Sequence, residues 1–237
     1  MNKNDSFIWI TGASSGIGKA LALEFTANEL PVIASARKKE SLQRVKKEVD
    51  QLNGRIELLP LDVKNYEEVE AAVQKLTAED SINCLINNAG ATSFKLAKDN
   101  SIEEIKEIID TNLYGSINTI KAVLPHMIER KKGTIINIIT VAAEKVLTKS
   151  SVYAASKAGL RAYAKVLREE VREHNIRVIN VLPGATRTPI WTNSALEEFG
   201  ERMMSPAELA KLIYNVYSIN SNLVAEEIQV RPIKGDL

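Results

Sequence analysis

The sequence predicts an α/β protein built on a doubly wound, parallel β-sheet with helices on both faces. Short apolar runs alternate with longer segments of helical period along the 237 residues, a pattern typical of a parallel sheet. Most of the apolar runs are continuous rather than alternating, which indicates strands covered on both faces. No Pro-, Gly- or Ser-rich linker and no internal repeat divides the chain. We therefore expect a single domain over residues 1–237.

The expected strands are the short apolar runs, which cover residues 7–11, 32–36, 56–59, 84–87, 134–139, 176–182 and 227–230. Two of the segments between them are clearly amphipathic. The first follows Asn65 and repeats apolar residues at i, i+3, i+4 and i+7, namely Val69, Ala72, Val73 and Leu76. The second begins near Ser101 and has isoleucines along one side, namely Ile102, Ile105, Ile108 and Ile109.

The composition is that of an ordinary globular protein. Thirty-one basic and thirty acidic residues leave a net charge of +1, so we expect neither nucleic acid nor a membrane as a partner. The single cysteine, Cys84, is expected to be buried in a protein from a reducing compartment. His126 and His174 have no neighbours at metal-ligand spacing, so no metal is expected. The sequence has no signal-peptide core and no apolar run near the ~20 residues of a membrane span, which favours a cytoplasmic location.

A glycine-rich turn joins the first strand to the first helix. It reads Thr-Gly-Ala-Ser-Ser-Gly-Ile-Gly from Thr11 to Gly18. Glycines let a backbone approach a pyrophosphate closely, and a helix N-terminus offers free N–H groups and a positive dipole. The spacing differs from the commoner Gly-x-Gly-x-x-Gly, and a merely structural turn is the alternative. The candidate cofactor-binding residues here are Gly12, Ser14, Ser15, Gly16, Ile17 and Gly18.

Further motifs follow this turn in a fixed order: Asp62-Val63 after the third strand, Asn87-Asn88-Ala89-Gly90 after the fourth, Asn112, Tyr153-x-x-x-Lys157, and Pro183-Gly184 with Thr188. Together with the turn they resemble the short-chain dehydrogenase/reductase family over nearly the whole chain. The resemblance implies a Rossmann-like fold and an NADP(H)-dependent oxidoreductase that interconverts a carbonyl and an alcohol. It also implies further cofactor-binding residues: Asp62, Val63, Asn88, Ala89, Gly90, Tyr153, Lys157, Pro183, Gly184 and Thr188.

Tyr153 is the expected acid/base. Hydride transfer to a carbonyl leaves negative charge on oxygen, so the site needs a proton donor. Tyr153 and Lys157 lie four residues apart and share one face of a helix. A nearby ammonium favours the phenolate, and we expect Lys157 to lower the pKa of Tyr153. The alternative is a packed tyrosine ring beside an exposed lysine.

Asn112 and Thr140 are the other two candidate catalytic residues. Asn112 lies on the apolar side of its helix, so its amide needs a hydrogen-bond partner. The resemblance implies that it holds a water in a proton relay, and a helix-packing amide is the alternative. Thr140 stands thirteen residues before Tyr153, where the family usually has serine. Its hydroxyl can donate to the substrate oxygen, although its methyl group takes up room. Ser150 and Ser151 are expected to act as helix caps.

The end of the second strand indicates the cofactor. NAD-specific folds generally place a carboxylate there for the ribose 2′-OH, whereas this strand ends Ala36-Arg37-Lys38-Lys39. The planar fork of Arg37 can pair with the 2′-phosphate of NADP(H). The alternative is a solvated basic helix start. The family's second basic site is Ser15 in this chain, so Arg37 is expected to carry most of the preference.

Residues 189–205 are expected to form a substrate lid, because apolar side chains are spread through a polar segment. A helix packed on the core is the alternative. We expect a small-molecule carbonyl or alcohol substrate, and a homodimer or homotetramer formed through the helices near Ser101 and Ser151.

A non-catalytic, NADP(H)-binding redox sensor is the main rival function, but it would not need Tyr153, Lys157 and Asn112. An extended epimerase or dehydratase would need a longer substrate lobe, and a purely structural protein would not need the glycine turn.

Overall fold

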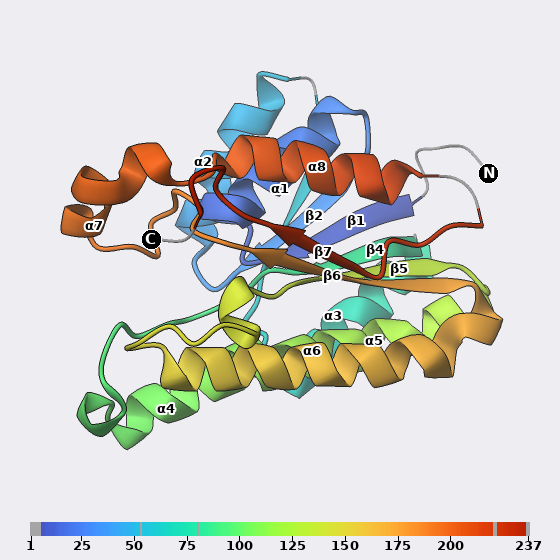
Figure 1. The fold of residues 1–237 in the computed structure, drawn as a ribbon. Coiled ribbons are helices and arrows are strands. Elements are labelled where there is room, and N and C mark those ends of the chain that lie inside the picture. Colours follow the sequence, from blue (N-terminus) through green and yellow to red (C-terminus); the bar gives the residue numbers. More distant parts are fainter. Residues whose placement is uncertain (1–5, 53, 80, 220–221, 236–237) are drawn as a thin grey trace.

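The computed structural model describes residues 6–52, 54–79, 81–219 and 222–235. Seven strands form one sheet in the order β3-β2-β1-β4-β5-β6-β7 (Figure 1), and all six neighbouring pairs are parallel. The predicted doubly wound sheet is therefore confirmed. The strands are β1 (Ser6–Thr11), β2 (Val32–Ala36), β3 (Ile56–Pro60), β4 (Ser81–Asn87), β5 (Gly133–Ile138), β6 (Ile176–Pro183) and β7 (Glu227–Val230).

Two strands, β4 and β5, differ from the expected bounds at more than one residue. β4 begins at Ser81 rather than at Cys84, because Ser6 pairs with Ser81 and Phe7 with Ile82 before a bulge shifts the register. Polar Ser81 and Asn83 hide this start from a search for apolar runs. β5 ends at Ile138 rather than at residue 139, because the chain then enters the 3₁₀ turn η3 (Val141–Ala143).

Helices cover both faces of the sheet (Figure 1). One layer contains α1 (Gly16–Ala27), α2 (Lys39–Asp50) and α8 (Pro206–Ser218), and the other contains α3 (Tyr66–Glu79), α4 (Ile102–Ile109), α5 (Gly115–Glu129) and α6 (Ser151–Val171). The short helix α7 (Asn193–Phe199) lies beyond the left end of the sheet in Figure 1. A π-helical turn, η2 (Asp110–Tyr114), joins α4 to α5.

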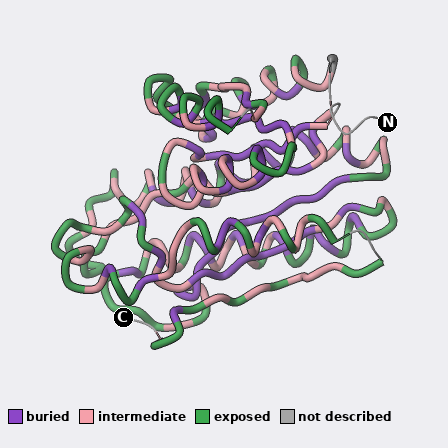
Figure 2. The backbone as a smooth tube through the Cα atoms, turned by 90° about the horizontal axis from the view of Figure 1, so that it is seen from above, coloured by how far each residue is buried: buried purple, intermediate pink, exposed green. Residues whose placement is uncertain are grey.

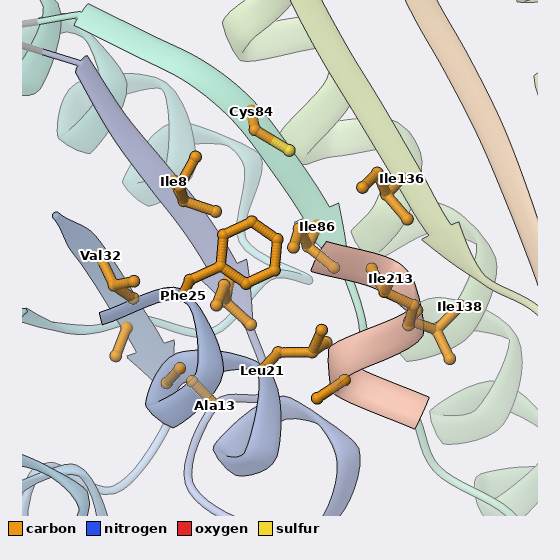
Figure 3. Packing of buried hydrophobic residues seen from close by; sticks show 14 of the residues in the cluster. Ile8, Ala13, Leu21, Phe25, Val32, Cys84, Ile86, Ile136, Ile138 and Ile213 are labelled. Atoms are coloured by element: carbon orange, nitrogen blue, oxygen red, sulfur yellow. The ribbon is translucent and has the colours of Figure 1, made fainter. Parts of the chain in front are cut away.

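Each helical layer has its own core. Under the first layer, Phe25 of α1 packs among strand residues such as Ile8 and Ile86 (Figure 3). Burying an aromatic ring of this size contributes about 1.5–3 kcal/mol. Under the second layer, Trp9 and Leu85 pack with apolar residues of α3, α5 and α6. Figure 2 shows the strands as nearly continuous buried segments between half-exposed helices.

The expected burial of Cys84 is confirmed, and one helix cap is corrected. Cys84 lies fully buried in the first core, where burial raises the pKa of its thiol. Ser150 stands at the N-cap of α6 but makes no side-chain cap bond. Its hydroxyl instead donates to the Leu147 carbonyl at 2.6 Å, because the chain folds back in the turn before α6. Ser151 is the first residue of the helix rather than its cap.

The strand order reverses between β1 and β4, because β1 leads to β2 on one side while β4 lies on the other. The loops that follow these two strands therefore diverge and leave a crevice at the carboxyl edge of the sheet, which is the usual ligand site in open α/β folds. Within the described ranges, no helix is long and apolar enough to cross a bilayer.

Candidate active site

A cavity of about 830 Å³ lies at this carboxyl edge. All of the site residues expected from the sequence line it except Gly18 and Asn112. The structure thus brings together residues from the ends of six strands, from Gly12 after β1 to Thr188 after β6. In the part of the chain that the structure describes, no group of three or more His, Cys, Asp or Glu side chains is arranged to hold a metal.

The glycine turn depends on the conformational freedom of its glycines. Gly12 and Gly16 have φ of +64° and +54°, a region that side-chain-bearing residues rarely adopt. Gly18 lies behind the turn, where a Cβ would come within 2.3 Å of the Gly12 carbonyl oxygen. Its absence from the cavity wall therefore has a packing reason. The result is an open cradle in front of the N-terminus of α1, which fits a pyrophosphate.

Asn88 and Thr11 join this turn to the end of β4. The Asn88 side-chain amide donates to the carbonyls of Thr11 at 3.0 Å and Gly12 at 3.1 Å. In return, the Thr11 hydroxyl accepts from the backbone N–H groups of Asn88 and Ala89, both at 3.0 Å. These bonds hold the two diverging loops in one geometry, so Asn88 shapes the crevice as well as lining it.

Arg37 lies on one wall of the cavity but is already paired. Its Nη1 atom is 3.1 Å from Oε1 of Glu107, on α4. The other oxygen of Glu107 accepts from Lys64 Nζ at 2.6 Å, and this hydrogen bond is the main reason that the pKa of the Glu107 carboxyl is lowered. Sequence reasoning missed Glu107, because a contact between residues 37 and 107 has no local signal.

Tyr153 and Thr140 meet at the far end of the cavity. Tyr153 lies in the first turn of α6 and Thr140 follows β5. The Thr140 hydroxyl faces the phenol and lowers the pKa of Tyr153, but desolvation has the larger effect and raises that pKa to about 12. The Thr140 hydroxyl also accepts from the Ala142 N–H at 3.2 Å. A substrate oxygen placed here would face two hydroxyl groups.

Lys157 behaves differently from the expectation based on helix spacing. Its ammonium is buried and donates to the Ile138 carbonyl at 2.7 Å, and burial lowers its pKa to about 8. The expected lowering of the Tyr153 pKa by Lys157 is not found, because the shift comes from desolvation of the phenol, which raises the pKa, and from the Thr140 hydroxyl, which lowers it. Spacing alone could not reveal this, because desolvation of both groups depends on how α6 packs against β6 and the turn η3.

Asn112 lies beneath the cavity wall, in the π-helical turn η2. Its Oδ1 accepts from the Ala91 N–H at 2.7 Å, and its Nδ2 donates to the Ala91 carbonyl and to the Ser156 hydroxyl, both at 2.9 Å. Ser156 in turn donates to the Tyr153 carbonyl at 2.7 Å. The amide thus connects the loop after β4 to the helix that carries Tyr153. Ser156 was not singled out from the sequence.

A row of buried polar side chains crosses the sheet below the site, and sequence reasoning missed it. Asn87, Asn137 and Asn180 occupy paired positions on β4, β5 and β6. Asn87 donates to Asn137 at 3.0 Å, and Asn137 donates to Asn180 at 3.2 Å. Asn180 then reaches Glu227 of β7 at 3.3 Å. Asparagines inside apolar strands are the signal that could have revealed this amide row.

The expected lid lines the cavity only with its first residues, Pro189, Ile190 and Trp191. Trp191 stacks on Phe94, from the loop after β4, with ring centroids 5.1 Å apart and an angle of 12° between the planes. The remainder of the segment turns away and returns to the core at Met203, which is buried. Phe94 was not predicted, because its role depends on a partner 97 residues away in the sequence.

The parallel sheet, the switch-point crevice and the glycine cradle are those of a dinucleotide-binding α/β protein. A family model described as short chain dehydrogenase matches residues 6–198. The chain therefore belongs to the short-chain dehydrogenase/reductase family of oxidoreductases, as its motifs indicated.

Individual proteins agree with this assignment. Dehydrogenase/reductase SDR family member 7 of Mus musculus is 35% identical over 206 residues, which are 84% of this chain but only 61% of the mouse protein. Sepiapterin reductase of Chlorobaculum tepidum is 32% identical over 236 residues, with 96% of each chain covered. A metagenomic short-chain oxidoreductase solved in complex with NADP superposes with a TM-score of 0.84, at 28% identity and with 97% of each chain covered.

Proposed function

We propose that this protein is an NADP(H)-dependent oxidoreductase that interconverts a carbonyl and an alcohol, with Tyr153 as the acid/base. The observation that carries the proposal is the contact between the Tyr153 and Thr140 hydroxyls in the same cavity as the glycine cradle. A protein that only sensed NADP(H) would have no need of a half-buried proton donor beside the cofactor site.

The cavity fits a dinucleotide along its length. The cradle at Gly12–Gly16 and the N-terminus of α1 would hold the pyrophosphate. Asp62 and Val63 would flank the adenosine end, and Pro183, Gly184 and Thr188 line the opposite end. The bound nicotinamide would supply or accept the hydride.

The side chains would then handle the oxygen and its proton. A phenol whose pKa is about 12 stays protonated at neutral pH, so Tyr153 can donate to the oxygen of a carbonyl. The Thr140 hydroxyl would hold that oxygen in place. The pKa of Lys157 is about 8, so its ammonium is present below that pH and is lost above it. We assign to Asn112 the positioning of Ala91, and the proton relay that the resemblance implies stays a prediction.

The preference for NADP(H) rests on Arg37. It follows β2 with no carboxylate at the strand end, and its guanidinium lines the cavity. The structurally similar oxidoreductase bound to NADP supports this choice. Lys38 also lines the cavity and adds positive charge beside Arg37.

The decisive experiment replaces Tyr153 with phenylalanine, which keeps the ring and removes the proton. NADPH-dependent reduction of a panel of ketones and aldehydes should fall by at least ~10²-fold, while NADPH binding measured by fluorescence stays nearly unchanged. Tyr163→Phe is the matched control, because Tyr163 lies on the same helix but does not line the cavity. Comparable turnover in folded Tyr153→Phe would refute the assignment.

A further inference from the structure

The charges that line the cavity are divided unevenly between its two ends. Four of the five charged lining residues lie at the adenosine end: Arg37, Lys38, Asp62 and Glu107. The end of β2 and the end of β5 are three strand spacings apart in the sheet, or about 14 Å at ~4.8 Å per spacing. The fifth charged residue, Lys157, is buried and bonded to the Ile138 carbonyl. Around Thr140, the described lining residues therefore offer no free cation to a substrate.

The rim of this uncharged end is apolar and exposed. Four large side chains from three different loops line the cavity and are also exposed to solvent: Phe94, Val146, Leu147 and Ile190. Val146 is 97% exposed and has almost no contact that would explain an apolar residue there. Apolar side chains that gather at a cavity mouth mark a surface that is covered when a ligand binds.

The Phe94–Trp191 stack stands at this rim, and its two rings are held differently. Trp191 is fixed, because its indole N–H donates to the Thr186 carbonyl at 2.9 Å and its backbone N–H donates to the Thr188 carbonyl at 3.3 Å. Phe94 is exposed and its ring has no polar group that could anchor it. A flat ligand could therefore take the place of Phe94 against Trp191 without breaking a hydrogen bond.

We infer that the substrates are uncharged carbonyl compounds that carry an aromatic ring, with Trp191 as the stacking platform for that ring. This inference rests on the proposed function for the carbonyl chemistry. A carboxylate next to the carbonyl would have to enter the uncharged end without a cation to pair with, which is unfavourable. An aromatic ring, by contrast, gains offset stacking on Trp191 and covers the apolar rim.

The test compares three ketones. Acetophenone is neutral and aromatic, phenylglyoxylate replaces its methyl group by a carboxylate, and cyclohexyl methyl ketone replaces its ring by a saturated one. We expect kcat/KM for acetophenone to exceed that for phenylglyoxylate by roughly 10²-fold, since the carboxylate would be buried unpaired. Trp191→Leu should lower kcat/KM for acetophenone by up to about tenfold and leave that for cyclohexyl methyl ketone nearly unchanged.

A binding measurement separates this inference from the proposed function. The chain has two tryptophans, and Trp9 is fully buried in the second core. Acetophenone should quench the fluorescence of Trp191, with or without NADP⁺, and the quenching should disappear in Trp191→Leu. If acetophenone quenches the fluorescence, phenylglyoxylate does not, and no ketone is turned over, the ligand class is supported and the proposed reaction is refuted. The inference alone would be overturned if phenylglyoxylate were bound or turned over as well as acetophenone. It would also be overturned if Trp191→Leu lowered kcat/KM equally for acetophenone and cyclohexyl methyl ketone. A complete absence of binding and turnover would overturn both.

Discussion

Thr140 uses one hydroxyl group for two roles. It caps the 3₁₀ turn by accepting from the Ala142 N–H at 3.2 Å, and it also faces the Tyr153 phenol and lowers its pKa. A hydroxyl group can accept and donate at once, so one side chain serves both. The extra methyl group that distinguishes Thr140 from serine is accommodated, because the residue is buried with both contacts formed.

Two substitutions separate the hydroxyl of Thr140 from its methyl group. Thr140→Val keeps the shape and removes the donor, so kcat/KM should fall by about 10²-fold, the scale of losing one oxyanion donor. Thr140→Ser keeps the donor and should stay within a few-fold of wild type. Steady-state kinetics of both variants decide the matter, with thermal melts to confirm folding. Similar kcat/KM values for Val and Ser would show that the hydroxyl takes no part.

Arg37 must exchange partners if it is to bind a 2′-phosphate. In the structure its guanidinium faces Glu107; the Arg37 side chain is largely exposed and that of Glu107 is partly exposed. Exposed ion pairs contribute only about 0–1 kcal/mol, whereas a charge-assisted contact to phosphate contributes roughly 1.5–3 kcal/mol. The 2′-phosphate should therefore displace Glu107 as the partner of the Arg37 guanidinium, although the Glu107 carboxylate also repels the phosphate.

Two changes at this pair should move NADPH affinity in opposite directions. Arg37→Ala should weaken NADPH binding by about one to two decades, and Ala36→Asp with Arg37→Ala should shift the preference towards NADH. Glu107→Gln should strengthen NADPH binding by a few-fold at low salt, where screening is weakest. Fluorescence titrations with NADPH and NADH test this, and NADH serves as the internal control. Weaker NADPH binding in Glu107→Gln would mean that Glu107 orients Arg37 rather than competing for it.

At the scale of elements, the amide row ties the four strands β4, β5, β6 and β7 together. Each amide satisfies its neighbour, and Thr119 of α5 donates to Asn87 at 2.6 Å. Buried polar groups with a complete set of partners specify one register, because a slip would leave every member unpaired. The ends of β4, β5 and β6 carry Asn88, Thr140 and Gly184, so this register also aligns the site.

Among the residues of the amide row, Asn137 is the one whose replacement should lower the stability of the fold most. Asn137→Ala would leave an amide N–H of Asn87 and the carbonyl of Asn180 without their present partners. At ~1–3 kcal/mol for each buried unsatisfied group, we expect a loss of about 2–5 kcal/mol. The melting temperature should fall by roughly 5–15 °C for a chain of this size. Asn215→Ala on α8 is the control, and an equally small shift in both variants would contradict the role of the row.

At the scale of the whole molecule, the outer face of α6 carries small residues that allow another helix to pack closely against it. Its exposed residues Ala155, Ala162 and Val166 fall on one stripe, with Val166 60% exposed. Exposed Ile102 of α4 and Tyr114 of η2 lie in the same helical layer. Small residues permit close helix approach, and a stable interface needs about 1,200–2,000 Å² of buried surface.

We therefore expect self-association through α4 and α6. Sedimentation at micromolar concentration should show a dimer or tetramer, and Val166→Glu should shift it towards the monomer by placing a charge in the interface. Leu52→Glu, an equally drastic change at an exposed leucine after α2, should leave the assembly intact. A wild-type monomer at this concentration would remove the prediction.

The sequence alone determined the fold class, the approximate positions of the strands and about half of the cavity wall. Apolar runs report burial directly, and motif residues at strand ends must gather at one edge of a parallel sheet. This reasoning placed Gly12, Arg37, Asn88, Tyr153 and Thr188 together before any contact was known.

Only the tertiary structure decided which of those groups touch and what that does to them. The Arg37–Glu107 pair and the Phe94–Trp191 stack join segments far apart in the chain, and the amide row depends on the register of β4, β5 and β6. The opposite pKa shifts of Tyr153 and Lys157 arise from burial. Packing sets all of these, because desolvation and long-range contact depend on distances in space that residue spacing along one chain does not contain.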